Sequence, residues 1–112
     1  MTKEADCNAR LVLTTASTPD EARRLGRALV EERLAACATL VPAVESIYRW
    51  QGAIETGVET LLLIKTTADC VDALKSRLHE LHSYEKPEFL VLQVDAGSKG
   101  YLAWLQDAVK KS

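Results

Sequence analysis

Apolar side chains recur along this chain with two different spacings, and each spacing predicts one kind of element. Four segments dense in branched and apolar residues are expected to form strands, at residues 10–15, 37–50, 53–67 and 88–94. Three segments with apolar residues three or four positions apart are expected to form helices, at residues 19–34, 68–82 and 101–109. This order predicts an α+β fold of the ferredoxin-like, split βαβ type. Right-handed crossovers would place two helices on one face of an antiparallel sheet, and the last segment would add a C-terminal helix.

Cap and turn residues mark where these elements begin and end. Thr18 is expected to cap the first helix, and Glu21 completes a capping box with it. Pro42 cannot donate to a sheet ladder, so it predicts a bulge, a bend or a sheet edge. Gln51-Gly52 is expected at the tip of a hairpin between the second and third strands.

Three further residues give expectations about local geometry. Gly57 is expected to kink the third strand, and Thr67 is expected to cap the second helix. Tyr101 is expected to face the core from the C-terminal helix.

The length of the central hairpin bears on assembly. Residues 1–9 are expected to form a flexible tail, and residues 10–112 a single domain. Strands of about 12 residues would each span roughly 40 Å, which exceeds the size of so small a core. Their edges would be satisfied by pairing with other copies in a closed assembly. The alternative is a shorter, frayed hairpin on a monomer.

Composition and charge narrow the classes of function. The 112 residues are 47% apolar and 27% charged, as in an ordinary globular domain, and the net charge is −2. No run of Lys or Arg suggests a nucleic-acid partner, and no apolar run is long enough for a membrane span. The three cysteines form no C-x-x-C pair, and the first residues do not resemble a signal peptide. We therefore expect a cytoplasmic protein with reduced thiols.

Metal binding is one candidate chemistry. Cys37, His79, His82 and Glu85 are the residues that could ligate copper or another divalent cation. His79 and His82 are three positions apart, so one helical face could present both. The alternatives are histidines that merely end a helix and a Cys37 that is buried as a small apolar residue.

A ligand pocket is the other candidate. Tyr48, Trp50 and Tyr84 could line a pocket between subunits, with Glu59 and Lys65 as polar anchors. Lys65 could instead guard a strand edge with its charge. Glu85 and Glu88 could act as a carboxylate pair or simply lie in a solvated turn. No nucleophile–base pair or nucleotide fingerprint is present, so we expect no enzyme activity.

Five sequence blocks in order resemble the CutA divalent-cation tolerance family. They are Glu32–Ala38, Ser46–Gly52, Leu62–Thr66, His82–Glu88 and Tyr101–Leu105. The resemblance covers residues 10–110 and implies a stable trimer of ferredoxin-like subunits whose long hairpins pair between subunits. It also implies a role in tolerance to copper and other divalent metals. Some family members carry Cys at the position of Thr14 and His at the position of Leu81, so this chain lacks two residues of the proposed copper site.

Two functional hypotheses follow. The first is a non-catalytic homotrimer that binds copper or another divalent cation through His82 and Cys37. The second is a trimeric small-ligand sensor or interaction scaffold similar to the PII signalling proteins. In that case Tyr48, Trp50, Tyr84 and Glu85 would line a site between subunits, and Lys65 would hold a small anionic ligand.

Overall fold

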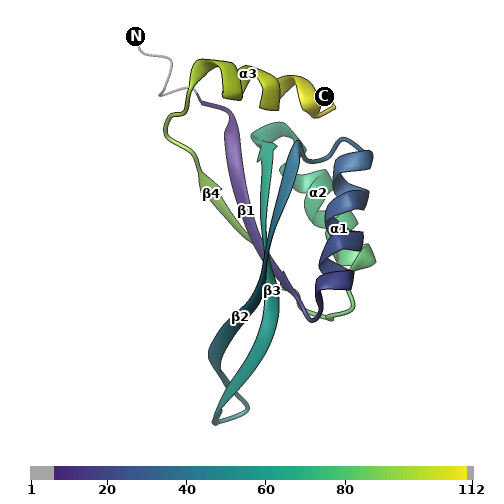
Figure 1. The fold of residues 1–112 in the computed structure, drawn as a ribbon, viewed down its shortest axis with the longest axis vertical. Helices are drawn as coiled ribbons and strands as arrows, with labels where there is room; N and C mark the ends of the chain where they lie inside the picture. The colour runs from purple at the N-terminus through teal and green to yellow at the C-terminus, as the bar shows by residue number, and fades with distance from the viewer. Residues whose placement is uncertain (1–6, 111–112) are drawn as a thin grey trace.

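The computed structural model describes residues 7–110, and all seven predicted elements are present, with one added 3-10 turn (Figure 1). The strands are β1 (Ala9–Ala16), β2 (Cys37–Trp50), β3 (Ala53–Thr67) and β4 (Leu90–Gln93). The helices are α1 (Pro19–Glu31), α2 (Val71–Leu81) and α3 (Lys99–Ala108), and the 3-10 turn η2 (Ala68–Cys70) precedes α2.

The sheet has the topology that the split βαβ pattern predicts. Its strand order is β2-β3-β1-β4, and every neighbouring pair is antiparallel. Helices α1 and α2 lie together on one face of this sheet, while α3 crosses the end opposite the hairpin tip (Figure 1). The ferredoxin-like α+β prediction is therefore confirmed for the single chain.

The main core lies between the sheet and its two helices. Alternate residues of the central strands, such as Val12, Leu62 and Ile64, point towards the helices and are fully buried. They pack against the apolar stripes of the helices at Leu25, Leu29, Leu74 and Leu78. A second, smaller cluster anchors α3 through Ala9, Ala36, Cys70, Leu105 and Val109. Tyr101 was expected to face the core, but it is 45% exposed and stacks beside Trp104.

In the described chain the opposite face of the sheet has no helix over it except at one end, where α3 packs against Ala9. Leucines that alternate with the buried core residues point to this side, which we call the open face. They are the half-buried Leu11, Leu13, Leu61 and Leu63 and the exposed Leu90 and Leu92. An antiparallel sheet with one solvated face would normally place polar residues there, so this apolar open face is unusual for a monomer.

The hairpin of β2 and β3 extends far beyond the helices, as predicted. The two strands contain 14 and 15 residues, and the molecule measures 49 × 27 × 22 Å. Gln51 and Gly52 form the tip with positive φ angles of 49° and 83°, as a tight hairpin turn requires. A register shift between Val41 and Val44 places the predicted bulge at Pro42. Gly57 causes no kink, because it stays in register opposite Ser46.

Helix α1 begins and ends with identifiable caps. The Thr18 hydroxyl accepts a hydrogen bond from the Glu21 amide at 3.1 Å, which confirms the N-cap. The helix was expected to reach Leu34 but ends at Glu31, because Arg33 adopts a left-handed φ of 62°. The amides of Arg33 and Leu34 then donate to the Val30 and Leu29 carbonyls in a Schellman motif, which closes the helix.

Other boundaries differ from the prediction by a few residues. Strand β4 spans only Leu90–Gln93 instead of 88–94. Residues 1–6 of the expected tail lie outside the described residues, and its last residue, Ala9, already belongs to β1. Thr67 precedes η2 but makes no side-chain cap, so that part of the expectation is wrong. None of the helices in the described residues is long and apolar enough to cross a membrane.

Candidate functional site

A large cleft lies between the outer half of the hairpin, towards its tip, and the segment after α2. Its volume is about 740 Å³. It is lined by Thr15, Ser46, Tyr48, Trp50, Glu59, Tyr84, Glu85, Lys86 and Glu88. We call this site the hairpin cleft. It contains every residue that sequence analysis assigned to a ligand pocket except Lys65.

The bulge in β2 decides which side chains reach the hairpin cleft. Before the bulge, Ala38 and Leu40 point towards the helices, opposite Ile64 and Leu62. The extra residues of the bulge reverse this alternation, so that Ser46, Tyr48 and Trp50 point to the open-face side.

Gly57 lies on the same face of the hairpin as these side chains. A Cβ atom at Gly57 would lie 4.0 Å from the Tyr48 hydroxyl oxygen. This is an ordinary van der Waals distance, so the Tyr48 hydroxyl reaches across to β3 beside Gly57 without depending on the absence of a side chain there.

Glu59 is the best oriented acid of the cleft. Its Oε1 accepts a hydrogen bond from the Ser46 hydroxyl at 3.0 Å, and its Oε2 accepts one from the Tyr84 hydroxyl at 2.8 Å. Burial and the neighbouring Glu59 carboxylate raise the pKa of the Tyr84 phenol. Tyr84 therefore stays protonated and keeps donating to Glu59 at neutral pH.

His82 contacts Tyr84 through both its ring and one ring nitrogen. Its buried ring lies 4.6 Å from the Tyr84 ring, centroid to centroid. Nε2 lies 2.7 Å from the Thr15 carbonyl oxygen, which can only accept, so Nε2 carries the proton. Nδ1 accepts a hydrogen bond from the Tyr84 amide at 3.0 Å. Both ring nitrogens are thus engaged in positioning the cleft wall.

Glu21 links the segment after α2, which carries Tyr84, to the start of α1. Its carboxylate accepts hydrogen bonds from the Ser83 amide at 2.8 Å and from the Ser17 hydroxyl at 3.0 Å. Its Oε2 also lies 3.6 Å from Nδ1 of His82. Burial alone would raise the pKa of Glu21, but the hydrogen bonds from Ser83 and Ser17 outweigh it and lower the pKa from 4.5 to about 2.

Lys65 does not belong to the hairpin cleft. It lies six positions from Glu59 along β3, roughly 20 Å away at the rise of an extended strand. Its Nζ donates to the Thr39 hydroxyl at 2.6 Å and lies 3.8 Å from Sγ of Cys37. The cleft instead carries three carboxylates, Glu59, Glu85 and Glu88, against the single ammonium of Lys86.

The predicted metal ligands do not meet within the chain. Cys37 on β2 lies opposite Lys65 on β3, and Lys65 lies opposite Leu11 on β1. His82 contacts Thr15, which is four positions from Leu11 along β1. This separation is roughly 13 Å. Within residues 7–110 no three His, Cys, Asp or Glu side chains are grouped so that they could hold a metal ion.

The exposed His79 also has a local contact. Its Nδ1 lies 2.8 Å from the Lys75 carbonyl oxygen, one helical turn earlier.

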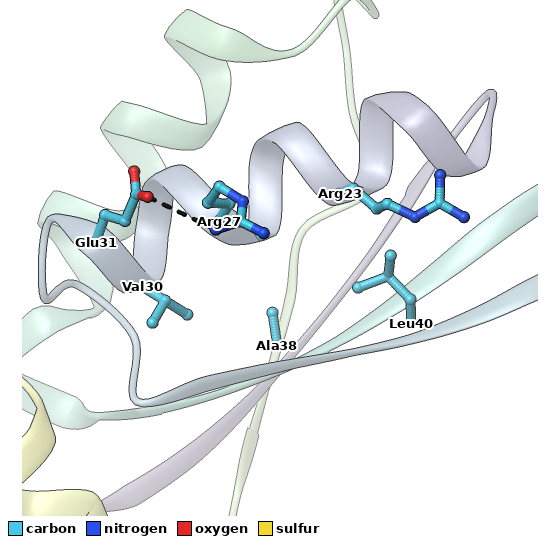
Figure 2. A pocket seen from close by; sticks show the side chains of 7 residues that line it. Arg23, Arg27, Val30, Glu31, Ala38 and Leu40 are labelled. Atoms are coloured by element: carbon cyan, nitrogen blue, oxygen red, sulfur yellow. Dashed lines mark ion pairs between the residues drawn. The ribbon is translucent and has the colours of Figure 1, made fainter.

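A second, smaller groove lies on the helical side of the sheet. It encloses about 330 Å³ between α1 and β2, with Arg23 and Arg27 at its rim and Val30, Ala38 and Leu40 along its apolar part (Figure 2). Arg27 is paired with Glu31 at 3.9 Å. Sequence analysis assigned no site here, and both arginines have acidic neighbours on their own helix.

Four residues of the cleft and its support were missed from the sequence, namely Thr15, Ser46, Lys86 and Glu21. Ser46 and Thr15 are small polar residues in strands, and nothing in their neighbourhood distinguishes them from surface positions. Glu21 was assigned only to a capping box, although it also bonds to Ser83 on a segment 62 positions away. The one available signal was period-two alternation, which places Ser46 on the face of Tyr48 and Trp50.

The fold and the cleft together define a small ferredoxin-like α+β protein with a cleft beside a long hairpin. Residues 10–108 match the family model of the CutA1 divalent ion tolerance protein. The divalent-cation tolerance protein CutA of Thermus thermophilus is 46% identical over 97 residues, which cover 87% of this chain and 94% of that protein. A chloroplastic CutA 1 protein of Oryza sativa is 36% identical over 102 residues, which cover 91% of this chain and 58% of that protein.

Solved structures give the same answer. The crystal structure of CutA from Xylella fastidiosa superposes with a TM-score of 0.89 at 44% identity, over 92% of this chain and 99% of that one. The chain therefore belongs to the CutA1 divalent ion tolerance family, and the resemblance seen in the sequence blocks is confirmed.

Proposed function

We propose that this chain acts in divalent-cation tolerance as a non-catalytic homotrimer, and that the hairpin cleft is its ligand-binding surface. The observation that carries the proposal is the apolar open face, which borders the cleft and, apart from its end at α3, has no covering element among the described residues. We take the occupant to be further copies of the same chain. In a closed ring of copies every such face is covered, and no exposed interface remains from which a filament could grow.

Exposed apolar residues on both sides of the sheet and its hairpin support assembly. Leu90 is 55% exposed on the edge strand β4, beside the leucines of the open face. On the overhanging hairpin, Ile47, Ile54 and Val58 point to the opposite side, away from the open face, and are between 60% and 69% exposed. Exposed apolar surface of this kind is typical of interfaces. The number of three subunits comes from the family resemblance.

The chemistry of the cleft supports binding over catalysis. No imidazole base is free beside a nucleophile there, because both ring nitrogens of His82 are already engaged. Aromatic walls with a few oriented polar groups are typical of ligand pockets. The anionic ligand of the earlier hypothesis is not supported, since Lys65 lies elsewhere and the cleft is acidic.

Direct copper binding is a second candidate, and Cys37 is the residue that favours it. Its thiol is half-buried and not in a disulfide, and thiol sulfur is the ligand that soft ions such as Cu(I) prefer. His82 offers no free nitrogen to the same ion unless the segment that carries it rearranges. We place the protein in the cytoplasm, where thiols remain reduced.

The assembly is tested by measuring the mass of the purified protein by sedimentation equilibrium. The wild type is expected at three times the 12.3 kDa chain mass. Leu90→Glu puts a charge on the open face and is expected to give monomers or dimers. Val30→Glu, a matched change of an exposed apolar residue on α1, is expected to stay trimeric. A wild-type monomer would refute the homotrimer.

The role of the cleft is tested in bacterial cells that lack their own CutA protein. Growth at raised copper is compared with the wild-type chain, Tyr48→Ala in the cleft and Cys37→Ser outside it. Loss of rescue with Tyr48→Ala alone would support the cleft as the functional surface. Loss of rescue with Cys37→Ser alone would favour direct metal binding and refute the proposal.

A further inference from the structure

We propose that the hairpin cleft binds a small organic cation, with ammonium or guanidinium groups held by aromatic rings and carboxylates. This inference rests on the proposed function, in which the cleft is the ligand-binding surface. It goes further because it assigns the chemical class of the ligand, and it reverses the anionic ligand expected from sequence.

The charge of the cleft lining is the first argument. Glu59, Glu85 and Glu88 face one positive group, that of Lys86. Within the described residues neither Glu85 nor Glu88 forms an ion pair. A cleft lined by one sign of charge raises the local concentration of ions of the opposite sign.

The aromatic rings are the second argument, because they separate an organic cation from other positive ions. Tyr48, Trp50 and Tyr84 line the same cleft as the carboxylates. The face of an aromatic ring attracts ammonium and guanidinium groups, and cages of such rings are a common way to bind them. A small hydrated metal ion would gain little from three rings, and no group of metal ligands is present among residues 7–110.

The orientation of Glu59 is the third argument. Ser46 and Tyr84 each donate one hydrogen bond to this carboxylate, at 3.0 Å and 2.8 Å. An ionised carboxylate can accept about four hydrogen bonds, so acceptor positions remain for a ligand. The two hydroxyls fix the group before any ligand arrives, which lowers the entropy lost on binding.

The size of the cleft agrees with a small molecule. A volume of about 740 Å³ lies within the usual range of small-ligand pockets, roughly 300 to 1,000 Å³. A flexible polyamine could extend along the cleft and meet several carboxylates with successive ammonium groups. Spermidine is therefore the probe that we choose for ammonium compounds.

The test is calorimetric titration of the full chain with spermidine, ATP without metal and copper(II) chloride, each at low and at moderate salt. Spermidine is expected to bind, and its affinity is expected to fall as salt rises. Glu59→Gln should weaken the binding about tenfold, because it removes the charge but keeps the shape. Trp50→Leu should weaken it at least about threefold. Glu31→Gln, a matched change in the groove of Figure 2, should leave the affinity unchanged.

The outcomes separate this inference from the proposed function. If a trimeric protein bound ATP and not spermidine, the ligand class would be wrong while the cleft proposal stood. If copper alone bound, and Glu59→Gln weakened it, a metal would replace the organic cation and overturn the inference. Equal weakening by Glu31→Gln and Glu59→Gln would reveal unspecific attraction and overturn it as well. Spermidine binding to a monomer would support the cation class and refute only the assembly.

Discussion

The Tyr84 hydroxyl donates a 2.8 Å hydrogen bond to Oε2 of Glu59, across 25 positions of sequence. This bond joins the segment after α2 to the centre of the long strand β3, and it closes one side of the hairpin cleft. Because His82 accepts a hydrogen bond from the Tyr84 amide and Glu21 accepts one from the Ser83 amide, the bond lies at the end of a chain of partly buried contacts. The cleft is therefore built by the fold and does not depend on a ligand to form.

Tyr84→Phe tests this bond directly. Removal of the hydroxyl leaves Glu59 with one donor, so we expect a loss of about 1 kcal/mol in the free energy of unfolding. Because the folded protein raises the pKa of Tyr84, an alkaline absorbance titration should show a late phase of phenol ionisation. The stability that the neutral phenol contributes is present below about pH 10 and is lost as the pH rises towards the folded pKa.

The control for this prediction is the absorbance titration of the variant. The late phase should vanish in Tyr84→Phe. If the late phase persists in Tyr84→Phe, another tyrosine is the protected one.

Glu21 makes the protein sensitive to acid. Its pKa is lowered to about 2 in the folded chain, so its contribution to stability is present above pH 4.5 and is lost as the pH falls towards 2. The shift corresponds to at most roughly 3 kcal/mol. Glu21→Gln should therefore be less stable than the wild type at pH 7, and the difference should shrink between pH 4.5 and 2.

Urea unfolding of both proteins across this pH range measures the difference. Asp20→Asn, an exposed acid one position earlier that pairs with Arg23, provides the matched control. A Glu21→Gln penalty that stays constant from pH 7 to pH 2 would show that lost packing, and not charge, explains it.

His82→Ala is predicted to act on the fold and not on copper. The substitution leaves the Thr15 carbonyl and the Tyr84 amide without their buried partner, which costs about 1–3 kcal/mol for each group. The unfolding midpoint should fall strongly, while the copper stoichiometry of the folded protein should remain that of the wild type. Equilibrium dialysis with copper at a temperature where both proteins are folded makes the comparison, and a lost copper equivalent would restore His82 as a ligand.

The order of elements could be predicted because each buried stripe follows its own period. Val12, Leu62 and Ile64 alternate with residues of the open face, and the helices bury one side of each turn. The end of α1 could not be predicted, because it depends on a left-handed Arg33 where a glycine would be the usual signal.

The candidate site could be predicted only in part, for a related reason. Alternation along a strand shows which residues share a face, but not how far apart they lie along it. Lys65 and Glu59 share the open-face side and are still six positions apart, so only Glu59 reaches the cleft. His82 looked like a free ligand because its partners, such as the Thr15 carbonyl, lie on backbone 67 positions away and leave no mark in the sequence.

The left-handed Arg33 provides the last prediction. A residue other than glycine at a φ of 62° carries a strain of about 1 kcal/mol, which glycine does not. The Arg33 side chain also donates a hydrogen bond to the Asp107 carbonyl at 2.9 Å, linking α1 to α3. Arg33→Ala removes this bond and keeps the strain, whereas Arg33→Gly removes both. We therefore expect Arg33→Gly to be more stable than Arg33→Ala by about 1 kcal/mol in urea unfolding, although the two variants lose the same side-chain contact. Equal stabilities would mean that the Schellman motif holds Arg33 without strain.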